Sequence, residues 1–285
     1  MNSRRNFLKL TGTGILAAGI APIYASSSTG EKKKKQVAAP VKPDLFSVGM
    51  AGFTFTRFNV EKTIEIMKKI GVTNLSLKEF HMPLNSTQEQ IDAVLAQFKA
   101  AGINVYTVGV IYMKTKESVD QAFNYAKMAG VKMIVGAPNY ELLPLVEQKI
   151  KEYDFKLAIH NHGPDNPLYP NATDIWDHIK DLDPRIGICI DIGHTTRDGA
   201  DPSVDIEKYK DRIYDIHIKD VDKAAKEGKT IEMGRGIIDI PKVVATLRKI
   251  NYSGKCSLEF EKDMNDPVVG IAESIGYFKG VMACK

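Results

Sequence analysis

The chain contains few cysteines, and their spacing matches no known motif. Its 285 residues include three, Cys189, Cys256 and Cys284. An odd number at these spacings fits neither a zinc site nor a redox pair. Cys189 and Cys256 fall inside apolar runs, which is typical of thiols that pack as small apolar side chains. No cysteine lies near residues 25–28, which argues against a lipid anchor there.

The sequence also lacks a strong net charge and a long apolar run. Its formal charge is +4, and a basic N-terminal region that includes Arg4, Arg5 and residues 32–35 accounts for the excess. The remainder is close to neutral, so the chain shows no electrostatic footprint for nucleic acid. The apolar stretch at residues 10–23 is short and rich in Gly and Thr, so it does not predict a spanning helix.

The N-terminal residues read as an export signal. The segment from Ser3 to Lys9 resembles the twin-arginine motif, and small residues at 25–27 offer a cleavage point. An uncleaved tail is the alternative. We expect a signal peptide over residues 1–28, a disordered linker over 29–43 and a folded domain over 44–285. The protein would then be periplasmic or secreted, without membrane association once the signal is removed.

From residue 44 onward, apolar strand-like runs alternate eight times with amphipathic helical runs. Near-continuous apolar strands separated by helices indicate a parallel sheet that helices cover. Eight such units predict a (β/α)8 TIM barrel. A doubly wound sheet lacks support, because no Gly-rich phosphate fingerprint follows the first strand. The expected strands cover residues 45–52, 75–80, 104–111, 132–136, 156–160, 186–192, 213–218 and 255–260.

Local signals mark the ends of several expected helices. Gly71, Gly102 and Gly130 each follow a helical run and precede an apolar lead into a strand. Glycine in this position favours a left-handed helix end. Ser86 and Glu89 have the spacing of a capping box, so we expect a helix to begin there.

Four expected strands end in a carboxylate or an imidazole. His160, Asp191, His217 and Glu259 each close an apolar run. The C-terminal ends of barrel strands meet at one mouth, where barrel enzymes carry their chemistry. A buried carboxylate is costly unless it is paired or bound to a cation. We therefore expect these four residues to bind one divalent metal ion. Mixed nitrogen and oxygen ligands favour Mn²⁺, Co²⁺, Fe²⁺, Ni²⁺ or Zn²⁺, with Mg²⁺ also possible, over Ca²⁺.

Other polar residues near the same strand ends are candidates for catalysis. Strand side chains repeat every second residue, so Asp215, His217 and Lys219 share one face, as do His160 and His162. We predict that Glu259, His162 and Lys219 carry the catalytic steps. A solvent-exposed lysine is the alternative for Lys219.

Substrate contacts are expected from a further group near the mouth. Its members end or follow predicted strands or, in one case, lie in a Gly-rich turn. Arg235 belongs to the turn Gly-Arg-Gly-Ile-Ile-Asp at residues 234–239, which could also be an ordinary loop. The predicted substrate-binding residues are Glu79, His81, His194 and Arg235.

Four features form a recognisable pattern: Asp191 with His194, His217 in His-Ile-Lys-Asp, Glu259 and the 234–239 turn. A chain with this pattern resembles the xylose isomerase-like TIM barrel superfamily. That superfamily includes sugar phosphate isomerases and epimerases, inosose dehydratases and apurinic endonuclease IV. The resemblance implies a metal site of His160, Asp191, His217 and Glu259. Its ketose 3-epimerases use a glutamate at the position of His160, so the resemblance does not favour a simple 3-epimerase.

Three functions fit these features. The first is a metal-dependent sugar or polyol isomerase or epimerase that works through a metal-bound enediolate. The second is a metal-dependent lyase or dehydratase on a keto sugar or keto-glycoside, similar to inosose dehydratase. The third is a non-catalytic sugar-binding barrel. In each case the partner is a small carbohydrate, a homo-oligomer is possible, and a DNA-repair role is opposed by export and the low charge of the domain.

Overall fold

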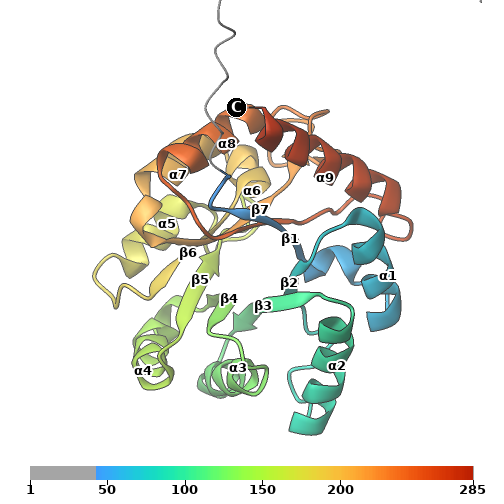
Figure 1. Cartoon of the computed structure of the whole chain (residues 1–285). Coiled ribbons are helices and arrows are strands. Elements are labelled where there is room, and N and C mark those ends of the chain that lie inside the picture. The colour runs from blue at the N-terminus through green and yellow to red at the C-terminus, as the bar shows by residue number, and fades with distance from the viewer. Residues whose placement is uncertain (1–42, 285) are drawn as a thin grey trace, which may run out of the picture. The chain divides into compact units, whose positions relative to one another are not determined.

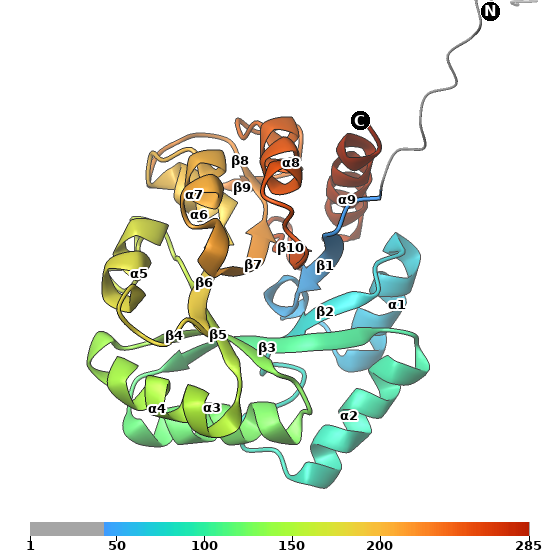
Figure 2. The same ribbon diagram turned by 60° about the vertical axis from the view of Figure 1, so that its left-hand side comes forward.

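The predicted barrel is the fold of the chain. The structure is a computed structural model and describes residues 43–284. The expected signal peptide and nearly all of the linker lie outside these described residues. Eight parallel strands close into a barrel in the order β1-β10-β7-β6-β5-β4-β3-β2. Helices surround the strands, as the view in Figure 2 shows.

All eight expected strands occur near their predicted positions. The largest differences are at their ends, by a few residues. The barrel strands are β1 (Ser47–Ala51), β2 (Asn74–Leu77), β3 (Asn104–Met113), β4 (Met133–Pro138), β5 (Lys156–His160), β6 (Ile186–Asp191), β7 (Ile213–Ile218) and β10 (Lys255–Leu258). Figure 1 shows their course along the chain.

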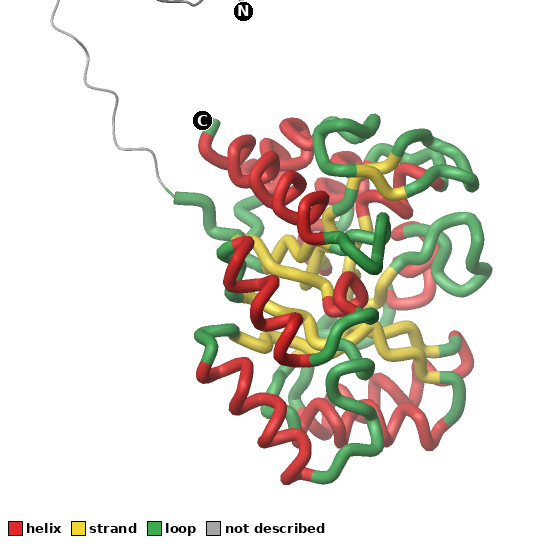
Figure 3. The backbone as a smooth tube through the Cα atoms, turned by 90° about the vertical axis from the view of Figure 1, so that its right-hand side faces the viewer, coloured by secondary structure: helices red, strands yellow, loops and turns green. Residues whose placement is uncertain are grey.

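Helices follow the strands and bury their apolar faces against them. In Figure 3 the strands lie inside and the helices outside. The α-helices are α1 (Val60–Ile70), α2 (Gln88–Ala100), α3 (Lys116–Met128), α4 (Leu143–Tyr153), α5 (Ala172–Ile179), α6 (Ile192–Arg197), α7 (Pro202–Lys208), α8 (Ile240–Lys249) and α9 (Val268–Ala283). Within residues 43–284, no helix has the length and apolarity needed to cross a bilayer.

The predicted helix ends are confirmed with one shift. Gly71, Gly102 and Gly130 have φ values of 62°, 74° and 69°, the left-handed region where glycine has no Cβ penalty. The capping box of α2 lies one residue later than expected. Thr87, not Ser86, caps the helix, and the side chain of Gln90 bonds back to the Thr87 N–H. Both pairs have the same spacing, so the motif alone does not separate them.

The loop after β7 contains a hairpin that the sequence did not predict. Strands β8 (Asp220–Val221) and β9 (Thr230–Ile231) pair antiparallel outside the barrel sheet. Asp220 organises this loop, because its carboxylate accepts hydrogen bonds from the backbone N–H groups of Val221, Gly234, Gly236 and Ile238. A Cβ on Gly236 would lie 2.1 Å from a carboxylate oxygen of Asp220. The glycine is therefore required for this close approach.

Candidate metal centre and adjoining pocket

The four predicted ligand residues come together at the C-terminal mouth of the barrel. His160, Asp191 and His217 lie at or next to the ends of β5, β6 and β7, and Glu259 follows β10. One ligand atom from each residue lies within 4.8 Å of all the others, and all four side chains are buried. Neighbouring strands in the closed order β10-β7-β6-β5 place them there, which is the geometry that the strand-end argument predicts.

Their donor atoms have the spacing of ligands that share one ion. His160 Nε2 lies 3.0 Å from His217 Nδ1 and 3.6 Å from Asp191 Oδ2. Glu259 Oε2 lies 3.5 Å from His217 Nδ1 and 3.8 Å from His160 Nε2. Two ligand atoms that are each about 2.1 Å from a metal are separated by about 3.0–3.4 Å in tetrahedral or octahedral geometry. The observed separations are close to this range.

Several polar atoms of this cluster have no hydrogen-bond partner although they are buried. They include His160 Nδ1 and His217 Nε2, whereas Asp191 Oδ2 has an ion pair with Lys219 at 3.1 Å. Buried polar atoms are nearly always satisfied, so unpaired ones require an explanation. A divalent cation would contact Asp191 Oδ2, Glu259 Oε2, His160 Nε2 and His217 Nδ1, the atoms that lie within reach of one another. Two imidazoles and two carboxylates also form a donor set that suits Mn²⁺, Fe²⁺, Co²⁺, Ni²⁺ or Zn²⁺. The residues present therefore fit a divalent metal ion.

Asp191 has a second contact that fixes its orientation. Its Oδ1 accepts a hydrogen bond from the backbone N–H of His194 at 2.8 Å and so caps α6. Its own N–H donates to the side chain of Asn161 at 2.8 Å. Helix α6 begins immediately after β6 and includes Gly193. The helix cap leaves Asp191 Oδ2 directed to the cluster.

Lys219 lies among three carboxylates rather than in solvent. Its Nζ is 3.1 Å from Asp191 Oδ2, 3.0 Å from Glu259 Oε2 and 3.1 Å from Glu261 Oε2, and the side chain is 1% exposed. Burial alone would lower the pKa of Lys219, but the charges of Asp191 and Glu259 outweigh it and raise that pKa. Lys219 therefore remains an ammonium at neutral pH. It can donate a hydrogen bond or a proton, and it is a poor base.

The same ion pairs keep the two carboxyl ligands ionised. Burial would raise the pKa of Asp191 and of Glu259. The charge of Lys219 outweighs this effect at both residues, and their pKa values are lowered. Both groups are carboxylates at neutral pH, which is the form that binds a metal.

A pocket of 240 Å³ opens beside the cluster. His160 and Glu259 line one part of it. The other walls carry three aromatic side chains, Phe53, Phe80 and Tyr112. Apolar rings beside a few convergent polar groups are typical of small-molecule sites. The pocket also includes three predicted residues, Glu79, His162 and His194.

His162 and His194 are neutral in this environment. Burial and the neighbouring imidazoles lower the pKa of His162 to about 3. Burial, as the largest cause, also lowers the pKa of His194 to about 3. His162 Nε2 is 2.7 Å from the hydroxyl of Tyr112, and its Nδ1 has no partner. A neutral imidazole has one N–H and one lone pair, so His162 can pass a proton.

Two predicted substrate contacts are not brought to the pocket. His81 Nε2 lies 3.2 Å from the hydroxyl of Thr63 and 3.1 Å from the carbonyl of Phe55, and His81 is not a lining residue. The expected two-residue alternation fails because β2 ends at Leu77. Arg235 is exposed and forms a bidentate pair with Glu273. The turn that contains Arg235 is held by Asp220, which accepts from the backbone N–H groups of Gly234 and Gly236.

The sequence argument missed several pocket residues. Lys78 is 5% exposed and donates to Glu79 at 2.7 Å and to the Val110 carbonyl at 2.5 Å. Its position directly after β2 is a usable signal, because charged residues also mark the ends of other strands at this mouth. Tyr112 belongs to β3, and nothing in that apolar run marks its side chain for the pocket. Asn161, between two histidines, was not considered as a support for Asp191.

Comparison with known proteins agrees with this fold. A curated relative, the rhizopine catabolism protein MocC of Rhizobium meliloti, is 27% identical over 133 residues, which are 41% of this chain and 40% of that protein. The inosose dehydratase of Bacillus velezensis is 28% identical over 39% of this chain and 42% of its own length. The chain thus spans about two fifths of the length of these relatives.

Solved structures match over more of the chain. A protein of unassigned function from Parabacteroides distasonis has a TM-score of 0.65 and 26% identity, over 85% of this chain and all of that one. The 3-keto-D-glucoside 4-epimerase YcjR from E. coli has a TM-score of 0.67 and 16% identity. The match covers 82% of this chain and 99% of that one. The family described as xylose isomerase-like TIM barrel matches residues 54–281. The chain therefore belongs to the xylose isomerase-like TIM barrel family.

Proposed function

We infer that this protein is a metal-dependent enzyme that isomerises or epimerises a sugar or polyol by moving a proton at a carbon next to a carbonyl group. One observation carries the inference. Four buried donor residues from four strand ends meet beside a pocket, with ligand atoms that all lie within 4.8 Å of one another. The family supports sugar-like substrates, since its named relatives act on such compounds.

His160, Asp191, His217 and Glu259 would hold the metal ion. When bound, such an ion polarises a carbonyl and makes the neighbouring C–H bond more acidic. The aromatic walls of the pocket would exclude water from the reacting carbon and pack against the apolar face of a sugar. Glu79 Oε2 is buried in this pocket without a partner, so it can accept a hydrogen bond from a sugar hydroxyl.

Proton transfer would fall to Glu259 and His162, which line the pocket, and to Lys219, which contacts Glu259 at 3.0 Å from the neighbouring cavity. Glu259 is a carboxylate and His162 has a ring nitrogen without a partner, so each is placed to accept a proton from carbon. Lys219 would donate to a developing oxygen anion, because it stays protonated between its carboxylate partners. Glu259 and His162 would therefore act as proton acceptors, and Lys219 would act as a donor.

The experiment begins with elemental analysis of the purified protein. Incubation of the metal-loaded protein with keto sugars in D₂O follows. We expect about one equivalent of a transition metal and deuterium at the carbon next to the carbonyl of the product. A protein that holds metal but incorporates no deuterium from any keto sugar would instead favour the non-catalytic sugar-binding barrel.

A metal-dependent lyase or dehydratase on a keto sugar or keto-glycoside is the second candidate. The observation that favours it is His160 at the end of β5, because it leaves one carboxylate fewer for proton exchange on two faces of a carbon. The similarity to inosose dehydratase points the same way. Mass spectrometry of the product separates the candidates, since a lyase releases water or an aglycone while an isomerase conserves mass.

We also propose that the protein is exported by the twin-arginine route to the periplasm or beyond. The segment from Ser3 to Lys9 supports this proposal. Replacement of Arg4 and Arg5 by lysine should trap the full-length chain in the cytoplasm, as fractionation and immunoblotting would reveal. Unchanged distribution of the Lys-Lys variant would exclude the route.

A further inference from the structure

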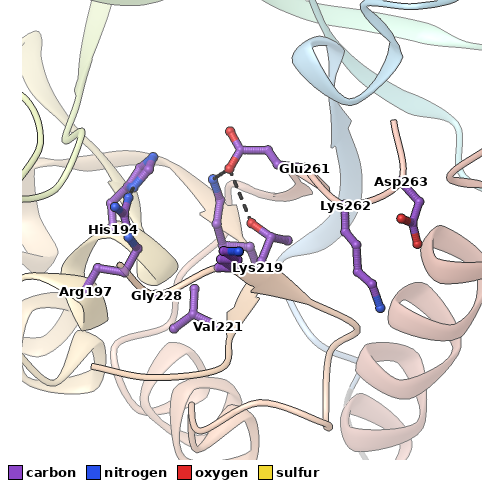
Figure 4. A pocket seen from close by; sticks show the side chains of 10 residues that line it. His194, Arg197, Lys219, Val221, Gly228, Glu261, Lys262 and Asp263 are labelled. Carbon is purple, nitrogen blue, oxygen red and sulfur yellow. Dashed lines mark hydrogen bonds and ion pairs between the residues drawn. The ribbon is translucent and has the colours of Figure 1, made fainter. Parts of the chain in front are cut away.

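A second cavity adjoins the candidate active site. It has a volume of 410 Å³ and shares two lining residues, His194 and Glu261, with the first pocket. In Figure 4, Glu261 and Lys219 lie between His194 on one side and Lys262 on the other. The two cavities therefore border the same pair of side chains, directly beside the predicted catalytic groups.

The second cavity is built by the hairpin that lies outside the barrel. Val221 and Thr230, from β8 and β9, and Gly228 and Lys229, from the loop between them, line it. Asp220 holds the base of the hairpin through its four backbone N–H contacts. The hairpin adds nothing to the barrel sheet, so its contribution to the mouth is this cavity wall.

Arg197 connects the hairpin loop to the active-site side. Its guanidinium contacts the carbonyl of Lys226 in the hairpin loop and the carboxylate of Asp165. Its Nη1 is 3.2 Å from His194 Nδ1. Because arginine can only donate, His194 accepts at Nδ1 and its neutral ring carries the proton at Nε2. The wall between the two cavities is therefore fixed by hydrogen bonds.

Most cations around this cavity already have acidic partners. Lys219 pairs with Glu261, Arg197 with Asp165, and Lys262 with Glu232 at 2.8 Å. Only the ammonium of Lys229, among the cationic lining groups, makes no ion pair within residues 43–284. Such a wall does not present the concentrated positive charge that a phosphate requires. It offers many hydrogen-bond donors and acceptors, which suits neutral hydroxyl groups.

The two cavities differ in their walls and together have the size of a larger ligand site. Phe, Tyr and Trp are missing from the residues that line the second cavity within the described chain, whereas three aromatic rings line the first. Small-molecule pockets have volumes of about 300–1,000 Å³. The first pocket alone, at 240 Å³, is below this range, and the pair falls within it.

We propose that the second cavity is a subsite for a neutral, hydroxyl-rich group that is joined to the reacting sugar, so that the substrate is a disaccharide or a comparable glycoside. The reacting unit occupies the aromatic pocket beside the predicted metal ligands. The second unit extends past His194 and Glu261 to the hairpin. This inference rests on the proposed function, because it assumes that the first pocket binds a sugar.

The test measures the binding of four probes to the full chain by isothermal titration calorimetry. The probes are D-glucose, the neutral disaccharides cellobiose and trehalose, and glucose 6-phosphate. We expect at least one disaccharide to bind about tenfold more tightly than glucose. Thr230→Trp should fill the second cavity and reduce this preference to about one. Lys223→Trp is the matched control on the same hairpin, because Lys223 is exposed and does not line the cavity.

Each contrary outcome is distinct. Equal affinity for glucose and both disaccharides would overturn the subsite, and so would a preference that Thr230→Trp leaves unchanged. Tighter binding of glucose 6-phosphate that Lys229→Ala abolishes would identify an anion site instead. Deuterium exchange from D₂O into a keto monosaccharide, together with equal affinities, would overturn the subsite and leave the proposed function standing. Absence of binding by all four probes would count against both.

Discussion

The barrel interior contains two polar layers that differ in how their groups are satisfied. Asp215 and His217 lie two residues apart on β7 and are both buried. In the lower layer, Asp215 Oδ2 accepts from the hydroxyl of Tyr106 at 2.8 Å, and that hydroxyl also contacts Ser257 Oγ at 2.7 Å. In the upper layer, His160 Nδ1 and His217 Nε2 have no hydrogen-bond partner.

This is the difference that we expect between a structural network and a binding site. Tyr106 is on β3, so its bond to Asp215 on β7 crosses the barrel and closes the lower network. Burying a polar group without a hydrogen-bond partner destabilises the fold. Where such groups lie within a cluster of four buried donor residues, a ligand is the simplest source of the missing contacts. Burial and charge alone do not distinguish the two layers. The layers differ in whether their buried polar atoms have hydrogen-bond partners.

The largest expected effect comes from breaking the upper layer. Asp191→Asn keeps an oxygen that can cap α6 but removes the negative charge from the cluster. We expect metal affinity to fall by at least about 100-fold, since even residues that only support a ligand contribute 10–100-fold. Metal content after dialysis provides the measurement, and circular dichroism verifies the fold. Full metal retention by this variant would mean that the upper layer is not a metal site.

The lower layer should instead control a pH dependence of stability. Burial raises the pKa of Asp215 from 3.8 to about 6. The folded protein then binds this proton more tightly than the unfolded chain, so the contribution to the free energy of unfolding is complete below about pH 4 and is lost as the pH rises through 6. The full loss corresponds to about 3 kcal/mol. Asp215→Asn should remove it.

Urea unfolding between pH 4 and pH 8 measures this difference. The wild type should lose stability relative to Asp215→Asn as the pH rises, and the metal content of the two proteins should be similar. Parallel stability profiles would show that Asp215 does not titrate in this range.

Tyr106→Phe should have a smaller effect confined to the same layer. The substitution removes the hydroxyl that bridges Asp215 and Ser257 and leaves both without that partner. The expected destabilisation is about 1–2 kcal/mol, the usual cost of an unsatisfied buried group. Chemical denaturation measures it, and elemental analysis should find the metal content unchanged. Loss of metal in this variant would mean that the lower layer also contributes to metal binding.

Arg235→Ala should have the smallest effect, because Arg235 belongs to neither layer. Its ion pair with Glu273 is exposed, and such pairs contribute about 0–1 kcal/mol. We expect thermal stability and sugar binding to stay close to the wild-type values. A large rise in KM without a change in kcat would restore Arg235 as a substrate contact and would extend the site beyond the upper layer.

The sequence was sufficient for the barrel and for the upper layer. Buried parallel strands are continuous apolar runs, so all eight were visible, and a polar residue that ends such a run stands out. His160, Asp191, His217 and Glu259 were found in this way. The barrel topology brings the ends of these strands together, so their proximity can be predicted without knowing any side-chain conformation.

Other features depend on contacts that the linear pattern does not contain. Strands β8 and β9 have two residues each, too few for a periodic signal. The direction of His81 depends on where β2 stops, and the role of Arg235 depends on how Asp220 folds the preceding turn. The difference between the two layers was likewise invisible, because Asp215 and His217 share a strand face and differ only in the partners that other strands supply.

The two oxygens of Asp191 restrict which residue can occupy this position. One oxygen starts a helix and the other faces the cluster. Serine and asparagine can start a helix but bring no charge, and glutamate brings the charge on a chain one methylene too long for the cap. Aspartate meets both demands, and each of these replacements would lose either the cap or the charge.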